Sequence, residues 1–282
     1  MKAYISIDIE GLPGIASLTM LAPGMTQFKR GEELMTLIAK ETAKTLLEKG
    51  FERVVVADSH GYMTNINPLD MPRNTTLIQG FPRPLSMVTG LDKTYDAALF
   101  LGYHAAAGTL HGFLDHTMSG RVFAEIRING ERASEYLINA LIAGENNVPI
   151  ILVAGDEHLR SEVEKHTPWS VFVVFKKGIT RYAAEYDSIE DILARLREGI
   201  SLATERLKRG EAKPLTFKPP YSVEVYVRDE IIADVLEVMP GITRESAYKL
   251  VFETKTASEM LKIIETIAFI GYGVYSLQSK LR

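Results

Sequence analysis

Two carboxylates lie two positions apart near the N-terminus, in the segment YISIDIEG that runs from Tyr4 to Gly11. Isoleucines alternate with polar residues there, which is typical of a strand whose side chains point to opposite faces with a period of two. Asp8 and Glu10 would then project from one face, about 6 to 7 Å apart. Two carboxylates so close repel each other, and burying them without a partner is costly. The pattern predicts either a solvated strand end or a cation site.

Polar side chains of the same kind end three further predicted strands. The segments RVVVADSHG, AALFLGYHA and PIILVAGDE are apolar runs that finish in Asp58, Ser59, His60, His104 and Asp156. Parallel strands bring their carboxyl ends to one edge of a sheet, where ligands bind in open α/β folds. A single polar residue after a strand is more simply a solvated loop residue, but four strand ends together favour a site. We therefore expect four side chains to converge: Asp8, Glu10, His60 and His104.

This set of side chains is typical of a metal centre. Carboxylates and imidazoles suit zinc, manganese or iron, and two ions that share a carboxylate are common in hydrolases. The chain has no cysteine. Thiolate ligands, disulfides and a cysteine nucleophile are therefore excluded.

A second group of candidates lies in GYHAAAGTLHGFLDHTM, which holds His104, His111 and His116, half of the six histidines. Its glycines and small residues suit a loop close to a ligand, although a flexible surface loop is the simpler alternative. His111 could be exposed and inert, and we expect His158 and His166 at the surface.

Other catalytic motifs are absent from the sequence. No GxGxxG lies between a strand and a helix, and there is no phosphate-binding P-loop and no GxSxG nucleophile elbow. Ser59 and His60 do not predict a triad, because neighbours along a strand face opposite sides.

The elements that must position these residues alternate between strand and helix. Periodicity predicts helices over residues 31–50 and 186–210, and a third begins at Ser134 as N-cap, after a strand and an Asn129-Gly130 turn. This order predicts an α/β fold with a largely parallel central sheet, helices on both faces and a smaller C-terminal α/β portion. We divide the chain into a metal-site domain, 1–180, and a C-terminal portion, 181–282, which either folds separately or belongs to the same compact unit.

Composition limits the partners. The 282 residues are 46% apolar and 24% charged, with a net charge of −4, which is an ordinary globular balance without the basic face of a nucleic-acid-binding protein. The sequence has no uninterrupted apolar run of about 18 residues and no signal-peptide pattern at its start. We expect no nucleic-acid or membrane partner and a cytoplasmic location.

Six segments together resemble a known family. SIDIEG, DSHG, GLDKTYDAALFLGYHA, DHTM, INGERASEYLINALIAG and ILVAGD occur in this order. Their order and spacing are similar to those of the zinc-dependent D-aminopeptidases, D-alanyl-D-alanine-type peptidases linked to dipeptide transport. The resemblance covers most of the first 180 residues and continues weakly to the end.

The resemblance implies a two-zinc site. Asp8 would bridge both ions, Glu10 and His60 would complete one site, and His104 and Glu135 the other. His116 matches the family's catalytic histidine, and its role as general base, proton shuttle or oxyanion donor stays open. The family also implies a homo-oligomer, a decamer of two stacked pentameric rings.

The resulting hypothesis is a metal-dependent aminopeptidase that hydrolyses short peptides with D-residues at the N-terminus, through water activated by two zinc ions. Manganese and iron stay open as the metal. GTLHGFL departs from the family, so the stereochemistry of the substrate carries over less safely than the metal site. The alternatives are another amide hydrolase, a phosphohydrolase that binds phosphate through Arg121 or Arg181, and a non-enzymatic scaffold that binds metal and forms a compartment.

Overall fold

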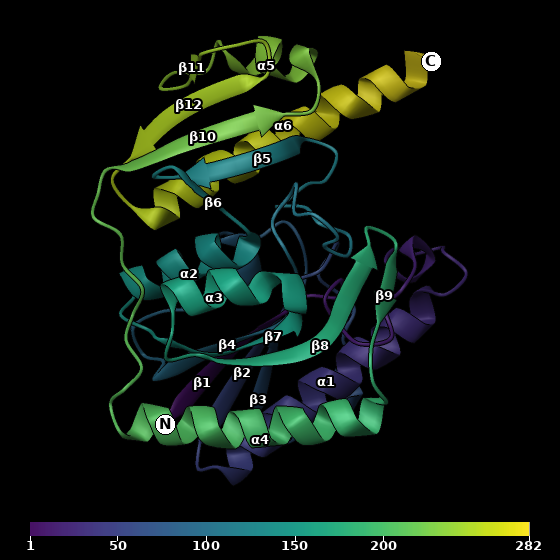
Figure 1. The fold of residues 1–282 in the computed structure, drawn as a ribbon, viewed down its shortest axis with the longest axis vertical. Helices are drawn as coiled ribbons and strands as arrows, with labels where there is room; N and C mark the ends of the chain where they lie inside the picture. Colours follow the sequence, from purple (N-terminus) through teal and green to yellow (C-terminus); the bar gives the residue numbers. More distant parts are fainter. Residues whose placement is uncertain (282) are drawn as a thin grey trace.

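The computed structural model describes residues 1–281, which form two lobes (Figure 1). The first lobe is built on a seven-stranded sheet with the order β3-β2-β1-β4-β7-β8-β9. Its strands are parallel except β9, which runs antiparallel to β8. The strands are β1 (Lys2–Ile7), β2 (Arg53–Asp58), β3 (Thr75–Ile78), β4 (Ala97–Tyr103), β7 (Ile150–Asp156), β8 (Val171–Thr180) and β9 (Ala183–Glu185).

Helices cover both faces of this sheet, as the sequence predicted. α1 (Phe28–Glu48) and α4 (Ile189–Lys208) lie on one face, and α2 (Glu135–Glu145) and α3 (Arg160–His166) lie on the other (Figure 1). The alternation along β1 explains the two cores: Ile5 and Ile7 belong to the apolar cluster with α1 and α4, whereas Tyr4 belongs to the cluster with α2. The α/β class with a largely parallel sheet is therefore confirmed.

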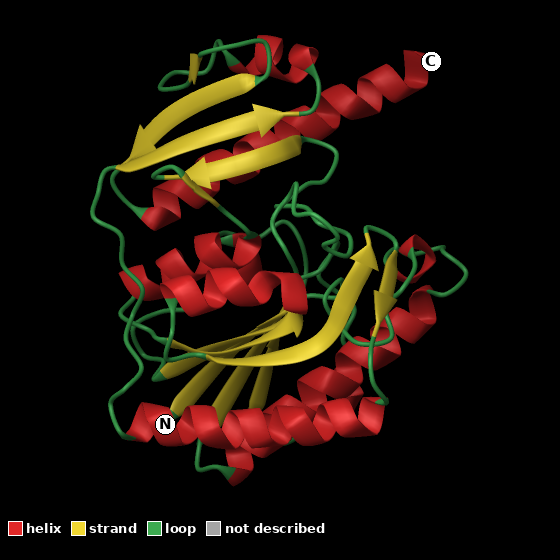
Figure 2. Cartoon of the chain, viewed as in Figure 1, coloured by secondary structure: helices red, strands yellow, loops and turns green. Residues whose placement is uncertain are grey.

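The second lobe is an antiparallel sheet with the order β11-β12-β10-β5-β6. A tight turn joins the hairpin strands β5 and β6 at Asn129 and Gly130, which both have positive φ, as sequence indicated. One long and one short helix complete the lobe (Figure 2). The elements are β5 (Phe123–Ile128), β6 (Glu131–Arg132), β10 (Tyr221–Val227), β11 (Thr243–Arg244), β12 (Lys249–Thr254), α5 (Glu230–Leu236) and α6 (Ala257–Leu281).

Each lobe includes segments from both sides of residue 180. The hairpin of β5 and β6 pairs with β10 in the second sheet, whereas α4 packs against β7 and β8 of the first. A division into folding units at residue 180 stays a prediction, since the chain crosses between the lobes more than once. Five elements had no counterpart in the sequence analysis: β3, β8, β9, β11 and α3.

α6 is long and apolar enough in Ala257–Lys280 to cross a membrane, judged by length and composition alone. One third of its most apolar window is buried, and the helix contacts α2, α5, β10 and β12. One helix of this length and composition is weak evidence for a membrane span. The expected absence of a membrane partner stays a prediction.

The backbones of β1 and β4 approach closely just beyond the end of β1. Asp8 N donates to Leu101 O at 2.8 Å, and Gly11 N donates to Gly102 O at 2.7 Å. Gly102 has a φ of +68°, and a Cβ there would lie 2.0 Å from Asp8 O. Only glycine fits this position, and its absent side chain lets Asp8 reach the edge of the sheet.

We predict that Gly102→Ala lowers the free energy of unfolding by about 3 kcal/mol or more, because the new Cβ meets backbone rather than a flexible side chain. Urea denaturation measures the change. Gly273→Ala is the control, since a Cβ there has no neighbour within 4 Å. Equal urea midpoints for Gly102→Ala and wild type would contradict the close approach.

Candidate metal centre

Asp8 lies at the centre of the convergent side chains. Its Oδ1 is 3.4 Å from His60 Nδ1, and its Oδ2 is 3.5 Å from His104 Nε2. Although β1 ends at Ile7, the residue still follows the strand directly, as expected. One carboxylate therefore faces two imidazoles through separate oxygens, which is the arrangement a bridging ligand needs.

A second carboxylate stands beside each imidazole. Glu10 Oε2 is 2.8 Å from His60 Nδ1, and Glu135 Oε2 is 3.7 Å from His104 Nε2. Ligand atoms about 2.1 Å from a tetrahedral zinc ion lie about 3.4 Å from one another, which is close to most of these separations. All five residues are buried. The structure thus brings together every residue of the expected ligand set.

Hydrogen bonds fix how the two imidazoles are turned. His60 Nε2 is 2.7 Å from Leu21 O, and His104 Nδ1 is 3.1 Å from Ala105 O. A ring nitrogen beside a carbonyl oxygen must donate, so the opposite nitrogen of each ring faces the carboxylates. Metal-ligating histidines are commonly oriented by such a bond.

While His60 is neutral and donates through Nε2 to Leu21 O, three buried atoms at the centre lack a hydrogen-bond partner among the described residues: Asp8 Oδ2, Glu10 Oε2 and His104 Nε2. Leaving such groups unpaired is costly, and metal ions would satisfy all three. The donor set and its orphaned atoms therefore fit a centre for two ions.

The electrostatics of the metal-free site show the same need for positive charge. Burial raises the pKa of Asp8 well above its usual range, and the neighbouring Glu10 raises it further. Burial opposes protonation of His60, but Glu10 and Asp8 outweigh it and raise the pKa of His60 well above normal. Burial lowers the pKa of His104, and nearby His116 adds to this, which favours the neutral form that binds metal.

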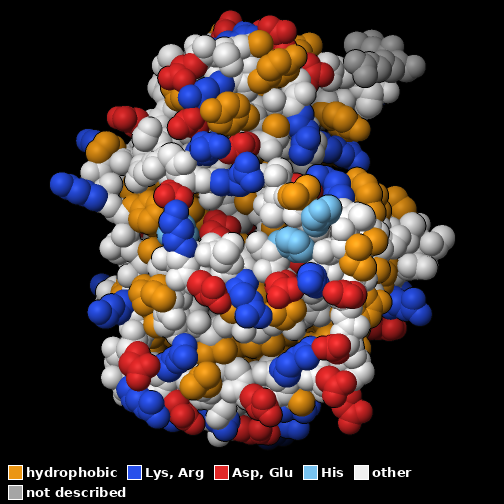
Figure 3. All heavy atoms as spheres, viewed as in Figure 1, with side chains coloured by type: hydrophobic (Ala, Val, Ile, Leu, Met, Phe, Trp, Pro, Cys, Tyr) orange, Lys and Arg blue, Asp and Glu red, His pale blue; other side chains and the backbone are white. Residues whose placement is uncertain are grey.

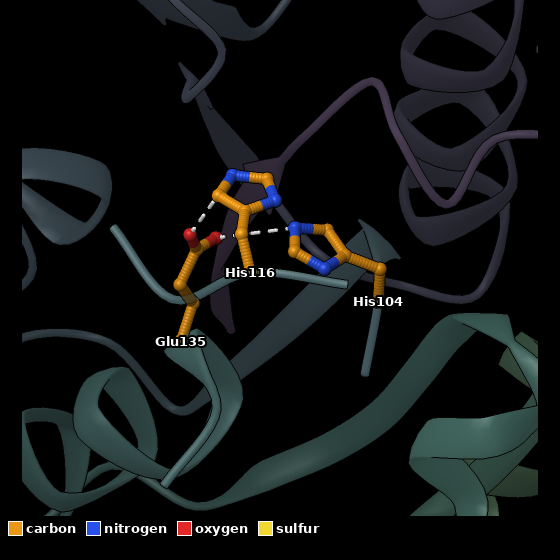
Figure 4. Close-up of side chains that lie close together, drawn as sticks. All are labelled: His104, His116 and Glu135. Atoms are coloured by element: carbon orange, nitrogen blue, oxygen red, sulfur yellow. Dashed lines mark ion pairs between the residues drawn. The ribbon is translucent and has the colours of Figure 1, made fainter. Parts of the chain in front are cut away.

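His116 lies beside His104 and Glu135 (Figure 4). Its ring stacks on that of His104 with centroids 4.3 Å apart, and its Nε2 is 3.6 Å from Glu135 Oε1. Its Nδ1 is 2.8 Å from Leu114 O and donates to it. Since His104, His116 and Glu135 offer ligand atoms within 4.8 Å of one another, His116 could either move protons or bind an ion.

Neighbouring segments hold the two glutamates. Met118 N donates to Glu135 Oε1 at 2.7 Å, and the Ser134 side chain caps α2 by accepting from Leu137 N, as the sequence indicated. The buried Lys176 Nζ donates to the backbone oxygen of Glu10 at 2.6 Å. Burial lowers the pKa of Lys176 to about 7. The sequence analysis missed Lys176, which looks like an ordinary surface lysine after an apolar run.

The remaining strand-end residues have structural contacts instead. Asp58 accepts from Asn65 N and Ile66 N, and Asp156 accepts from Phe113 N and Gly178 N. Ser59 joins a buried hydroxyl network with Ser6, at 2.9 Å. His111 is exposed and lies outside the metal-competent groups, and His158 and His166 are only partly exposed.

A cavity of about 420 Å³ opens from the metal centre toward the second lobe. Figure 3 shows histidine side chains at the surface about midway between the two lobes. Positive and negative side chains are interspersed over the rest of this face. Asp8, Glu10, His60, His116 and Glu135 line one side. Glu265, Ala268, Phe269 and Tyr272 of α6 line it as well, a contribution that the sequence analysis missed. Only tertiary packing reveals it, because α6 reads as a plain apolar helix.

The fold and the site define a metal-binding α/β protein with adjoining ligand sets and a ligand-sized cavity, the architecture of a metal-dependent hydrolase.

Comparison with known proteins agrees with this class of protein. Residues 1–266 match a family model described as D-aminopeptidase. The chain is 34% identical over 243 residues to a D-aminopeptidase of Bacillus subtilis (strain 168), which covers 86% of each chain. A solved structure is described as the Zn-dependent D-aminopeptidase DppA from Bacillus subtilis, a self-compartmentalizing protease. The present chain superposes on it with a TM-score of 0.91 at 30% sequence identity, and the superposition covers 96% of this chain and 98% of that one.

The chain therefore belongs to the D-aminopeptidase family, and it is an enzyme, a peptide hydrolase. The resemblance found in the sequence is confirmed.

Proposed function

We propose that the protein is a zinc-dependent aminopeptidase that removes D-amino acids from the N-termini of short peptides, with two zinc ions in each chain. The observation that carries the proposal is the Asp8 carboxylate, whose two oxygens face His60 and His104 separately. Asp8, Glu10 and His60 would hold one ion. Asp8, His104 and Glu135 would hold the other.

When bound in such a centre, zinc lowers the pKa of a bound water and polarises a carbonyl oxygen. The chain supplies the rest. His116 keeps Nδ1 on Leu114 O, so its Nε2 faces Glu135 at the rim of the cavity, where it can hold or pass a proton. The buried apolar side chain of Met87 lines the cavity as well and limits contact between the reacting groups and bulk water.

The cavity favours a peptide over a phosphate ester. Binding phosphate usually requires arginine or lysine, and no such residue lines the cavity among residues 1–281. Arg181 pairs with Asp115, and the Arg121 guanidinium lies over the Tyr275 ring, 4.9 Å from its centroid. Neither arginine is placed as the phosphohydrolase alternative requires.

We also propose that the enzyme is a homo-oligomer, a decamer of two stacked pentameric rings. DppA is described as self-compartmentalizing. In this chain the outer half of α6 exposes four large apolar side chains: Phe269, Tyr272, Tyr275 and Leu277. Large apolar side chains that gather in this way on one surface element are often covered by association with another chain.

We predict that the purified wild-type enzyme contains about two zinc ions per chain and that Asp8→Ala loses both, because one carboxylate serves both ions. Plasma mass spectrometry measures the metal, and hydrolysis of D-alanyl-D-alanine, compared with the L-dipeptide, measures activity. We expect activity on the D-dipeptide to fall at least about 100-fold. Asp70→Ala, at an exposed position, is the control. A metal-free wild type that zinc cannot reload would refute the proposal, and manganese or iron at full occupancy would correct the metal.

For His116→Ala we predict that turnover falls by about 100-fold or more while the zinc content stays at the wild-type level, since removal of a proton-transfer group costs about that much. The same two measurements are made on His111→Ala, whose exposed side chain lies outside the centre, and we expect no change. Loss of zinc from His116→Ala would show that His116 is a ligand.

The oligomer predicts a mass near ten times the 31.4 kDa of one chain in size-exclusion chromatography with light scattering. Tyr275→Ser combined with Leu277→Ser should shift the protein to smaller species, because the substitutions remove exposed apolar surface from α6. Leu69→Ser, at a position 91% exposed on the first lobe, is the matched control. A wild type that elutes as a monomer would disprove the assembly.

A further inference from the structure

Among the described residues, the cavity has one acidic side chain beyond the metal centre. Most of its other walls are apolar or neutral, with Met63, Phe81, Met87 and Phe269 among them. Apart from the metal-centre residues and His116, Glu265 is the single aspartate, glutamate, histidine, lysine or arginine that lines the cavity within the described chain. A lone carboxylate on a largely apolar wall needs an explanation, because most ligand pockets place few polar groups and use them to orient the ligand.

Glu265 lies in α6, one turn before Phe269, whose ring packs against Phe81 at 5.5 Å between centroids. It is only partly exposed, and no lysine, arginine or histidine of residues 1–281 forms a salt bridge with it. Burial raises the pKa of Glu265, an effect that Ser86 and Arg83 only partly offset. A cation beside the carboxylate would stabilise its ionised form.

Arg83 is already occupied by the backbone. Its guanidinium donates to Asp58 O, Ile78 O and Ser86 O at 2.6 to 3.1 Å. These bonds fix the segment that carries Ser86 and Met87 into the cavity wall, and Glu265 has no direct ionic partner among the described residues.

With metal bound, the Glu265 carboxylate would be the one uncompensated negative charge among the described residues that line the cavity. Two divalent ions would neutralise the carboxylates of Asp8, Glu10 and Glu135, and a hydroxide formed from bound water would at most balance the one remaining positive charge. The loaded centre would therefore have no net negative charge with which to attract an ammonium group. A positively charged part of a ligand is then drawn to the one remaining acid.

We infer that Glu265 pairs with a cationic nitrogen of the substrate while the scissile carbonyl lies at the metal centre. The inference rests on the proposed aminopeptidase function and assigns Glu265 to the binding of the positively charged group of the substrate. The nitrogen is either the α-ammonium group or the side-chain ammonium of a basic D-residue. In both cases the first lobe binds the reacting carbonyl and the second lobe binds the charge.

A purely structural role is the competing explanation. Glu265 could serve only to hold α6 against the segment of Ser86. Glu265→Gln separates the two, because glutamine keeps the size and the hydrogen-bonding capacity of the side chain and removes only the charge. Glu259→Gln makes the same change at an exposed position of the same helix and is the matched control.

The experiment uses zinc-loaded enzyme with equal metal content in all variants. Hydrolysis of D-lysine p-nitroanilide and D-norleucine p-nitroanilide gives kcat and KM, and calorimetry gives the affinity for free D-lysine and D-norleucine. D-Norleucine has nearly the length of D-lysine but lacks the side-chain ammonium group. We expect Glu265→Gln to raise KM and weaken binding by about 10- to 100-fold, the range for loss of a charged hydrogen bond, with a smaller change in kcat.

A loss with both ligands assigns Glu265 to the α-ammonium group, and a loss with D-lysine alone assigns it to the basic side chain. Affinities and KM values within about twofold of wild type for both ligands would overturn the inference. If wild type binds the amino acids but hydrolyses neither anilide nor any D-dipeptide, the proposed function fails, and the binding comparison still decides the role of Glu265.

Discussion

The structure depends on the concentration of negative charge where β1 meets its neighbours. Asp8, Glu10 and Glu135 are buried side by side, and each would be unfavourable there without compensating positive charge. The metal-free protein compensates partly through protonation of the site, because the carboxylates raise the pKa of His60. Divalent ions compensate far better, since they also satisfy the orphaned ligand atoms. The site is thus a local cost to folding that metal binding converts into stability.

The rest of the first lobe holds this charge in place. The glycine at position 102 lets the backbone of Asp8 lie against β4, and Lys176 binds the carbonyl oxygen of Glu10 from behind. Among the described residues, the second lobe adds no side chain to the proposed ligand set. Its long helix α6 instead lines the cavity together with the metal centre, so the wall of the cavity is built from both lobes. The hairpin of β5 and β6 connects the two lobes, because it follows the His116 loop and precedes Glu135 in the chain.

Much of this arrangement is predictable from the sequence, for a physical reason. The rule that parallel strands end at one edge of a sheet predicts that Asp8, Glu10, His60 and His104 converge. The same rule cannot separate Asp58 and Asp156 from the ligands, because an aspartate that fixes a loop looks identical in sequence. Glu135 came only from the family resemblance, since an acid in the first turn of a helix is already favoured by the helix dipole. The role of α6 depends on packing between distant segments, which local periodicity does not encode.

The surrounding structure holds the walls of the cavity in a fixed shape, independently of any compartment around the enzyme. Three non-glycine residues that line it, Met63, Ser86 and Met118, have φ between +45° and +62°, a conformation that surrounding structure must impose. Loops held in this way are formed before the ligand arrives, which lowers the entropy lost on binding. A preformed cavity of about 420 Å³ accepts a ligand the size of a short peptide and offers little room for a folded chain. A ring assembly would limit access to the active site further, but the size of this cavity already favours a small ligand within one subunit.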